Sequence, residues 1–216
     1  MLAEIHVFDR LAAHASAEKR IYYGIAWRDY IRLLDELSDD SHIRLTFDHG
    51  VLEVMSPKAL HEELVRLIDM IVTYIAFASG QNVKNCGAMT MRARQAERGG
   101  EPDSCFYIAH EPQVRGLDDI DLQVHPPPDI VLEIDITHPS LDKFGLYAAV
   151  LVPEVWRYKD GQMQFYVLGE DAYQSATFSN AFPRLSPAMI ERYLAVGRTA
   201  GSSAMFRLIT AELSRA

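Results

Sequence analysis

The sequence predicts one α/β domain, and three stretches carry that prediction. Residues 126–143 read as an alternating strand that runs through a short turn into a helix. Two β-hairpins are expected, one at about 42–57 around an Asp-His-Gly turn signal and one at about 155–168. A long helix at about 58–79 is so apolar that it belongs in the middle of the fold. No internal repeat or linker divides the chain, so we expect a single domain over residues 1–216.

The remaining elements follow from local periodicity and from turn residues. Gly80 should end the apolar helix, and the prolines at 126–128 should stiffen the entry into the central strand. In chain order we also expect an N-terminal arm at 1–25, a helix at about 26–37, one or two strands at 81–94, a short strand at 103–108, a loop at 109–125, a loop-rich stretch at 170–188 and one or two closing helices at about 187–213.

The composition is that of a globular protein, with 49% hydrophobic residues. The formal net charge of −9 argues against a protein that holds nucleic acid by bulk electrostatics. It does not exclude a nuclease, because metal ions and a local basic rim can serve the phosphates. Cys86 and Cys105 show no disulfide framework and are expected to be reduced core residues. Without a signal-peptide start or an apolar run of about 20 residues, we expect a cytoplasmic protein with no membrane span.

The central strand carries acids on one face. Asp129, Glu133 and Asp135 share that face, and the other face is apolar. Carboxylates are costly to bury without cations or hydrogen-bond donors, so the acidic face should line a cleft, a metal site or solvent. Asp129 and Glu133 lie about 13 Å apart at about 3.3 Å per residue, too far to share one ion easily. The partner of Glu133 should therefore come from a neighbouring strand, and Asp103, at the mouth of a short apolar strand, is the candidate.

Asp103 and Glu133 are thus the predicted metal ligands, and Lys143 is the predicted cation beside them. Mg²⁺ (or Mn²⁺) prefers oxygen ligands and keeps several waters, so two carboxylates and a backbone carbonyl suffice. Such an ion lowers the pKa of a bound water and neutralises charge on a phosphodiester. Lys143 lies in a helix that Ser140 is expected to cap, and it could activate the water or stabilise developing charge. The sequence leaves these two roles open.

Other polar residues have a plain interpretation beside a functional one. Asp129 is either a strand-entry residue or an additional site acid, and Asp135 is either solvated or an acceptor behind the site. The scattered histidines lack zinc-ligand spacing and are better interpreted as surface or core residues. His61 and Glu62 stand out among the candidates because the start of their helix could lie over the cleft.

Taken in order, these pieces resemble the PD-(D/E)XK superfamily of restriction-endonuclease-like proteins and, within it, the Uma-two family. The resemblance spans roughly residues 27–168. It rests on RLTFDHGVLEVMSPKALHEEL at 44–64, EPDSCFYI at 101–108, PPPDIVLEIDITHPSLDK at 126–143 and YAAVLVPEVWRY at 147–158.

The resemblance implies a restriction-endonuclease-like fold with a mixed central β-sheet flanked by α-helices, a Mg²⁺-type site and hydrolysis of DNA. It places the family's acid pair at Asp103 and Glu133, its lysine at Lys143, and the helix acid of the superfamily near Glu62. One departure stands out. Asp135 occupies the position, two residues after Glu133, where the superfamily motif has its lysine.

Three functions compete at this point. The first is a metal-dependent DNA endonuclease, with a homodimer as one form of assembly. The second is a non-catalytic DNA-binding or assembly module on a nuclease fold, which the negative charge and the absent in-strand lysine both favour. The third is a metal-dependent hydrolase of a smaller phosphoester.

Overall fold

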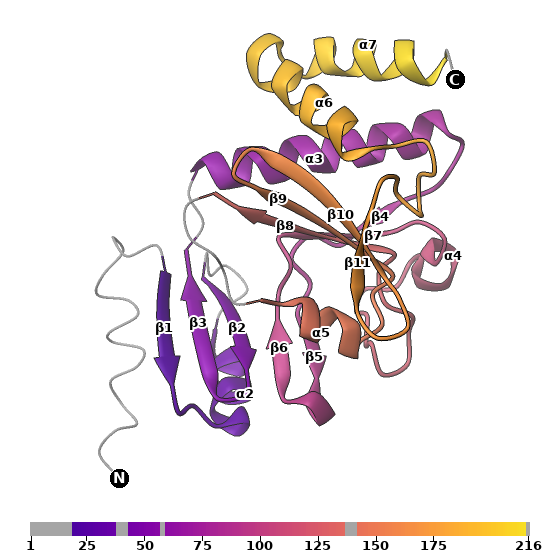
Figure 1. The fold of residues 1–216 in the computed structure, drawn as a ribbon. Helices are drawn as coiled ribbons and strands as arrows, with labels where there is room; N and C mark the ends of the chain where they lie inside the picture. Colours follow the sequence, from indigo (N-terminus) through magenta and orange to yellow (C-terminus); the bar gives the residue numbers. More distant parts are fainter. Residues whose placement is uncertain (1–18, 38–42, 57–58, 137–141, 215–216) are drawn as a thin grey trace.

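A computed structural model describes residues 19–37, 43–56, 59–136 and 142–214 of the protein (Figure 1). The helices are α2 (Trp27–Glu36), α3 (Ala59–Ala78), α4 (Glu111–Val114), α5 (Phe144–Ala149), α6 (Pro187–Ala200) and α7 (Ser202–Leu213). The strands are β1 (Lys19–Tyr23), β2 (Arg44–Asp48), β3 (Val51–Met55), β4 (Lys84–Asn85), β5 (Met91–Ala93), β6 (Arg98–Gly100), β7 (Ser104–Tyr107), β8 (Ile130–Asp135), β9 (Glu154–Lys159), β10 (Gln162–Leu168) and β11 (Tyr173–Ala176).

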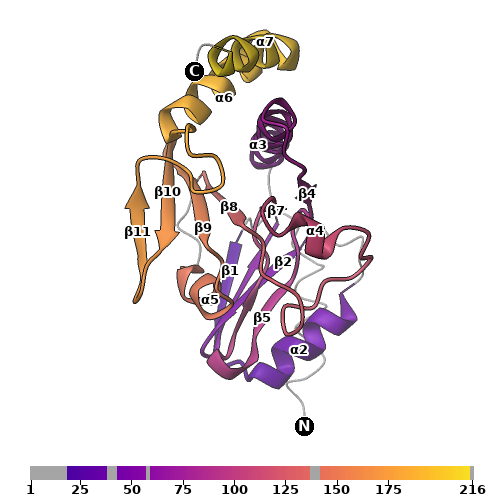
Figure 2. The ribbon, with the colours of Figure 1, turned by 90° about the vertical axis from the view of Figure 1, so that its right-hand side faces the viewer.

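The larger sheet has six strands in the order β11-β10-β9-β8-β7-β4. Strands β8 and β9 run parallel, and the other neighbouring pairs are antiparallel, so the sheet is mixed. Helices α3, α6 and α7 pack over one face (Figures 1 and 2), whereas α5 contacts the opposite face. This is the helix-flanked mixed sheet that the resemblance implies.

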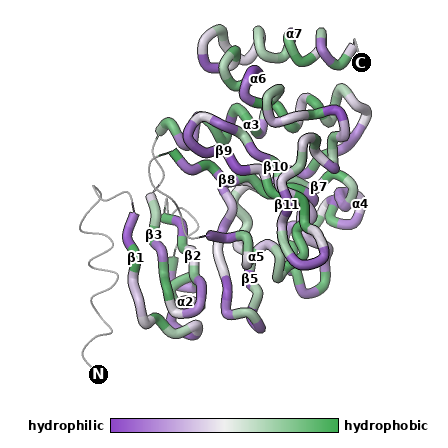
Figure 3. The backbone as a smooth tube through the Cα atoms, in the orientation of Figure 1, coloured by the Kyte–Doolittle hydropathy of each residue, from purple (hydrophilic) through white to green (hydrophobic). Residues whose placement is uncertain are grey.

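The predicted central strand is β8, which is buried along its whole length. Its even-numbered residues join the large apolar cluster beneath α3, whose tube is green over much of its length in Figure 3. Val131 instead joins a cluster with Leu146 and Tyr147 of α5. Because side chains alternate along a strand, Glu133 and Asp135 point to the α5 side of the sheet.

The smaller sheet has five antiparallel strands in the order β1-β3-β2-β6-β5. The first predicted hairpin is formed by β2 and β3, and φ is 44° at His49 and 86° at Gly50 in its turn. Two successive residues with positive φ are typical of a type I′ turn, which matches the twist of the flanking strands. Helix α2 covers this sheet through Tyr30, whose ring stacks on Phe47 at 5.1 Å between centroids.

Several local predictions differ from the structure. β1 forms within the stretch predicted as an arm, where it pairs with β3, and residues 1–18 lie outside the described residues. α4 adds one helical turn to the predicted loop at 109–125, and β11 pairs with β10 inside the predicted loop at 170–188. α5 begins only after Lys143, because Asp142 Oδ1 accepts a hydrogen bond from the backbone N–H of Phe144 at 3.0 Å. Ser140, the predicted cap, lies outside the described residues.

The prediction of closing helices agrees with the structure. Helices α6 and α7 occupy the predicted closing segment at about 187–213. Cys86 and Cys105 are free thiols, and Cys105 is buried. Among the helices described, none is both long and apolar enough to cross a membrane.

Candidate active site

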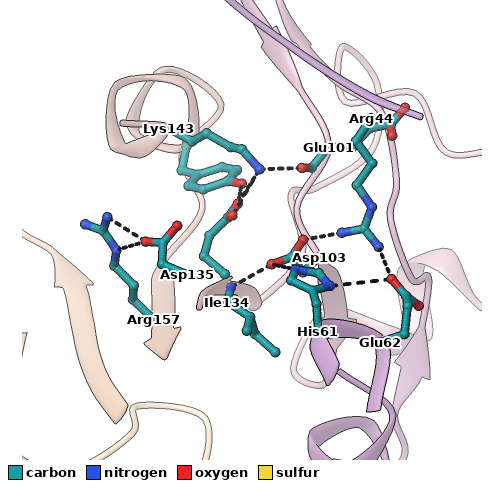
Figure 4. A network of polar contacts seen from close by, with 11 residues as sticks. Arg44, His61, Glu62, Glu101, Asp103, Ile134, Asp135, Lys143 and Arg157 are labelled. Carbon is teal, nitrogen blue, oxygen red and sulfur yellow. Dashed lines mark hydrogen bonds and ion pairs between the residues drawn. The ribbon is translucent and has the colours of Figure 1, made fainter. Parts of the chain in front are cut away.

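Asp103 and Glu133 lie on neighbouring strands of the six-stranded sheet. Ser104 is the register partner of Leu132 in the antiparallel pair of β7 and β8, so the next residues outward are Asp103 and Glu133. The backbone N–H of Ile134 donates a 2.6 Å hydrogen bond to Asp103 Oδ2, which fixes the aspartate against β8 (Figure 4). Both acids are buried, with 3% and 8% of their surface exposed. The structure therefore brings together the two acids that the sequence paired.

Lys143 and Tyr147 hold the carboxylate of Glu133. Lys143 Nζ lies 3.0 Å from each carboxylate oxygen, and the Tyr147 hydroxyl donates to Oε1. Lys143 Nζ also donates to the backbone carbonyl of Glu101 at 2.7 Å, and Figure 4 shows it between that carbonyl and the glutamate. Lys143 and Tyr147 reach the same group because they are four residues apart at the first turn of a helix. Their backbones are joined by the hydrogen bond from Tyr147 N to Lys143 O.

Burial shifts the pKa values of Glu133 and Lys143 against their charge partners, and the outcome differs between the two. Burial raises the pKa of Glu133 to about 7, because the charge of Lys143 offsets the loss of hydration only in part and the charge of Asp103 adds to it. Burial also acts to lower the pKa of Lys143, but the charges of Glu133 and Asp103 outweigh it and raise that pKa above its ordinary value. Lys143 is therefore a cation at neutral pH.

Asp103 is neutralised from the other side by residues of the smaller sheet and of α3. Arg44 of β2 donates to Asp103 Oδ1, and His61 Nε2 lies 3.0 Å from Asp103 Oδ2. Burial alone would raise the pKa of Asp103, but its hydrogen bond to His61 and the charges of His61, Lys143 and Arg44 together lower it. The guanidinium of Arg44 also reaches Glu62 Oε1 at 3.2 Å. The His61 and Glu62 candidates thus lie at the site, as their place at the start of α3 suggested.

Asp135 is paired with Arg157 of β9. Nε and Nη2 of Arg157 both lie 2.7 Å from Asp135 Oδ2, and the guanidinium carbon lies 5.9 Å from the ring centroid of Phe144. A cavity lies between the Asp135–Arg157 pair and the Glu133–Lys143 pair. Its volume of about 10 Å³ is close to the smallest that holds one water molecule. The cavity is lined by Glu133, Asp135, Asp142, Lys143, Phe144, Tyr147 and Arg157.

Asp129 stands apart from this group. Its Oδ2 accepts the backbone N–H groups of Ile108 and His110 at 2.6 and 3.0 Å, and Oδ1 lies 2.8 Å from His110 Nδ1. These contacts tie the start of β8 to the segment after β7, at the other end of that strand from Asp103. They match the strand-entry interpretation of Asp129.

Sequence reasoning missed three side chains at the site. Arg44 and Arg157 each sit in a short alternating strand, where a charge on a buried face is the available signal. Tyr147 is marked by its spacing of four residues from Lys143. None of these patterns predicts which acid each side chain contacts, because the acids that bind Arg44 and Arg157 lie in other segments of the chain.

Residues 27–197 match the model of the Uma2 family, which is described as "Putative restriction endonuclease". The chain belongs to the Uma2 family. A similar solved structure is the crystal structure of "a putative nuclease belonging to DUF820" from Anabaena variabilis ATCC 29413. The two share 12% sequence identity with a TM-score of 0.51, over 79% of this chain and 99% of that one. No curated protein matches the sequence.

These comparisons confirm two predictions, the family and the fold. The match covers most of the chain, including Asp103, Glu133 and Lys143, and the structural likeness extends the fold assignment to the restriction-endonuclease-like class. A likeness at this level of identity speaks to the fold, so the roles of individual residues in this Uma2 protein rest on its own geometry.

The donor set for a metal ion can be judged from the contacts alone. In the described part of the chain, no group of three or more His, Cys, Asp or Glu side chains is arranged so that it could hold a metal ion. Two carboxylates are nevertheless enough protein for a hard divalent ion that keeps several waters. A carboxylate offers about four acceptor positions, and the contacts of Asp103 and of Glu133 each use three of them. The site therefore fits such an ion only in competition with its own cations.

Proposed function

We propose that this Uma2-family protein is an endonuclease that hydrolyses DNA phosphodiester bonds with the help of Mg²⁺ or Mn²⁺. The observation that supports this best is the pair of buried acids, Asp103 and Glu133, on neighbouring strands, with the Lys143 ammonium bonded to one of them. A buried acid whose pKa is shifted by burial and by specific charged partners is a candidate for a functional site. We also propose that the protein is cytoplasmic, with a homodimer as one form of assembly.

In this proposal Asp103 and Glu133 hold the divalent ion. When bound, the ion would polarise the phosphodiester and lower the pKa of an attacking water. The cavity beside Glu133 has room for about one water molecule, and Lys143 and Tyr147 both line it. These two residues can therefore orient a water next to the carboxylate.

Of the two roles that the sequence left open for Lys143, charge stabilisation has the better support. Its pKa is raised by Glu133 and Asp103, so it keeps its proton at neutral pH and cannot take one from water. A buried ammonium is suited to stabilise the negative charge that develops on a phosphate during hydrolysis. We assign that role to Lys143.

A non-catalytic DNA-binding or assembly module is the second candidate, and one observation favours it. Both carboxylates are already neutralised, Asp103 by Arg44 and Glu133 by Lys143. A site that is satisfied by its own cations can be a relic of a nuclease site that now stabilises the fold. The absence of a lysine two residues after Glu133 points the same way.

Cleavage of supercoiled plasmid in Mg²⁺ or Mn²⁺ distinguishes the two candidates. The native protein should nick or linearise the plasmid, and Asp103→Asn and Glu133→Gln should each lower the rate by about a hundredfold or more, the size expected for loss of a group that stabilises the transition state. Asp129→Asn is the matched control, because it changes a buried acid beside the same strand and Asn can still accept both backbone N–H groups.

The outcomes separate cleanly. Equal cleavage by the native protein and by the Asp103 and Glu133 variants would place the activity elsewhere or in a contaminant. If the purified native protein binds DNA but cleaves none in either metal, the catalytic proposal fails and the binding module is supported.

A further inference from the structure

Arg157 lies on the active-site face of the sheet, directly beside Glu133. In the parallel pair of β8 and β9, Glu133 and Arg157 are register partners. Neighbouring strands lie about 4.8 Å apart, and register partners in a ladder point to the same face. Arg157 therefore places a second cation next to the Glu133–Lys143 pair, and both cations line the same small cavity.

The guanidinium of Arg157 is held on two sides. Asp135 binds its Nε and Nη2 at 2.7 Å, and the Phe144 ring lies under it at 5.9 Å. An arginine has five N–H donors, and within the described ranges its hydrogen bonds reach only one oxygen, Asp135 Oδ2. The side chain keeps 23% of its surface exposed. Donors thus remain for a ligand that approaches from solvent.

This arrangement gives Asp135 a role that neither the family resemblance nor the proposed catalysis accounts for. Asp135 stands where the superfamily motif has its lysine, yet it does not leave that position negative, because it is paired with Arg157. Figure 4 shows this pair on one side of Lys143 and the Arg44–Asp103 pair on the other. The net effect is a fixed, partly exposed guanidinium one strand away from Glu133.

We propose that Arg157, oriented by Asp135 and Phe144, binds the phosphate that neighbours the cleaved one on the same DNA strand. This inference rests on the proposed function, in which Lys143 serves the cleaved phosphate. A planar guanidinium with free donors matches the oxygens of a phosphate, and pre-orientation lowers the entropy cost of binding. Glu133 and Asp135 lie two residues apart on the same face of β8, about 7 Å at about 3.3 Å per residue, so the two cations that they hold are offset along the strand.

The test is DNA binding in EDTA, measured by fluorescence anisotropy of a labelled duplex over a range of salt concentrations. Each phosphate contact contributes about 0.9 to the slope of log affinity against log salt. Arg157→Met should reduce the magnitude of this negative slope by about 0.9 and weaken binding about five- to tenfold near 0.1 M salt. Arg157→Lys should keep the slope, since the charge remains. If Arg157 has only a structural role, Arg157→Met will leave the slope unchanged, and Arg157→Lys will have no loss to restore.

Arg192→Met is the matched control. Arg192 is also paired with an acid, Glu212 at 2.6 Å, and also lies over an aromatic ring, Tyr193 at 5.7 Å, but it sits on α6. The Arg192→Met variant should bind DNA with the affinity and salt dependence of the native protein. If Arg157→Met fails to fold because Asp135 is left unpaired, Asp135→Asn/Arg157→Met restores neutrality and should show the same loss of slope.

The results bear on the two proposals separately. Native-like slope and affinity in Arg157→Met, or an equal loss in Arg192→Met, would overturn the subsite and leave the nuclease proposal intact. Binding that follows the expected pattern without any cleavage would support the subsite while the catalytic proposal fails. Absence of DNA binding by the native protein would overturn both.

Discussion

At the scale of single residues, each acid of the candidate site has its own cation. Asp103 is bound by Arg44, Glu133 by Lys143 and Asp135 by Arg157. A buried charge without a partner is far less stable than a paired one, so these contacts keep the acids ionisable inside the protein. The same contacts compete with any metal ion, and this competition can be measured.

Arg44 is the cation whose removal should help a metal ion most. It comes from the other sheet, 59 residues away from Asp103 in sequence, and it can turn to Glu62 without leaving the site. A hydrogen bond between charged groups is worth about 1.5–3 kcal/mol, so Arg44→Met should tighten Mn²⁺ binding about tenfold or more. Titration of Mn²⁺ followed by electron paramagnetic resonance measures this directly.

Two variants guard the interpretation of that titration. Arg192→Met, on α6, should bind Mn²⁺ as weakly as the native protein does. Arg44→Met/Asp103→Asn should lose the gain, because the ligand is gone. Unchanged Mn²⁺ affinity in Arg44→Met would show that Arg44 does not compete for Asp103.

The Glu133–Lys143 pair should behave as a coupled unit in stability. Removing one partner of a buried pair leaves the other charge uncompensated, so Lys143→Met should lower the free energy of unfolding by about 3–5 kcal/mol. The double variant Glu133→Gln/Lys143→Met should cost about 2 kcal/mol less than the sum of the single changes. Urea unfolding at pH 8, followed by circular dichroism, provides the three values. Simple additivity would mean that the two charges do not depend on each other.

At the scale of elements, Asp69 joins α3 to the strand that follows Asp103. Ser104 donates to Asp69 Oδ1 at 2.7 Å in a buried contact. Burial raises the pKa of Asp69 above its ordinary value of 3.8, and the hydrogen bonds from Ser104 and Asn85 and the charge of Arg66 oppose this only in part. Ionisation of Asp69 therefore lowers the free energy of unfolding.

This loss of stability predicts a specific pH dependence. Above pH 3.8 the unfolded chain has lost the Asp69 proton while the folded protein still holds it, so the free energy of unfolding falls as pH rises toward the folded pKa. Asp69→Asn does not titrate and can still accept from Ser104. Its stability relative to the native protein should increase across that window, as measured by urea unfolding from pH 3.5 to 7. Parallel stability curves for the two proteins would contradict the prediction.

The elements also show what sequence patterns could and could not predict. α3, β8 and the two hairpins carry strong periodicity or turn residues, and all of them are present. β1 and β11 are short edge strands of mixed polarity, whose formation depends on the strand beside them and not on their own pattern.

The same limit applies to the site. Asp103 and Glu133 were identifiable because an acid in an apolar strand is unusual, whichever residue it contacts. Lys143, the partner of Glu133, was also identifiable, but Arg44 and Arg157 were not, since they reach Asp103 and Asp135 only after the strands have paired. Asp135 shows the consequence. In the sequence it is a departure from the expected lysine, and in the structure it is the acid that holds Arg157.

At the scale of the whole molecule, the two sheets meet at the candidate site. Each sheet has an apolar cluster of its own, one around Tyr30 and Phe47 in the smaller sheet and a larger one beneath α3. A third cluster joins Met91 of β5 to Cys105 and Val131 of the larger sheet. The Arg44–Asp103 contact also links the two sheets, and Arg98 of β6 donates to the carbonyl of Gly145 in α5 at 3.4 Å. The chain also crosses between the sheets several times, so unfolding of one sheet would strip contacts from the other.

We therefore expect the sheets to unfold together, as the single-domain prediction requires. The two tryptophans divide conveniently, because Trp27 packs with the smaller sheet and Trp156 lies in the core of the larger one. In Trp27→Phe and Trp156→Phe the remaining tryptophan reports on one sheet, whereas far-ultraviolet circular dichroism reports on both. Within each variant the fluorescence and dichroism midpoints in urea should coincide. If the Trp27 signal changes at a lower urea concentration than the dichroism does, the smaller sheet is a separate unit, and Arg44 can leave Asp103 without unfolding the nuclease-like core.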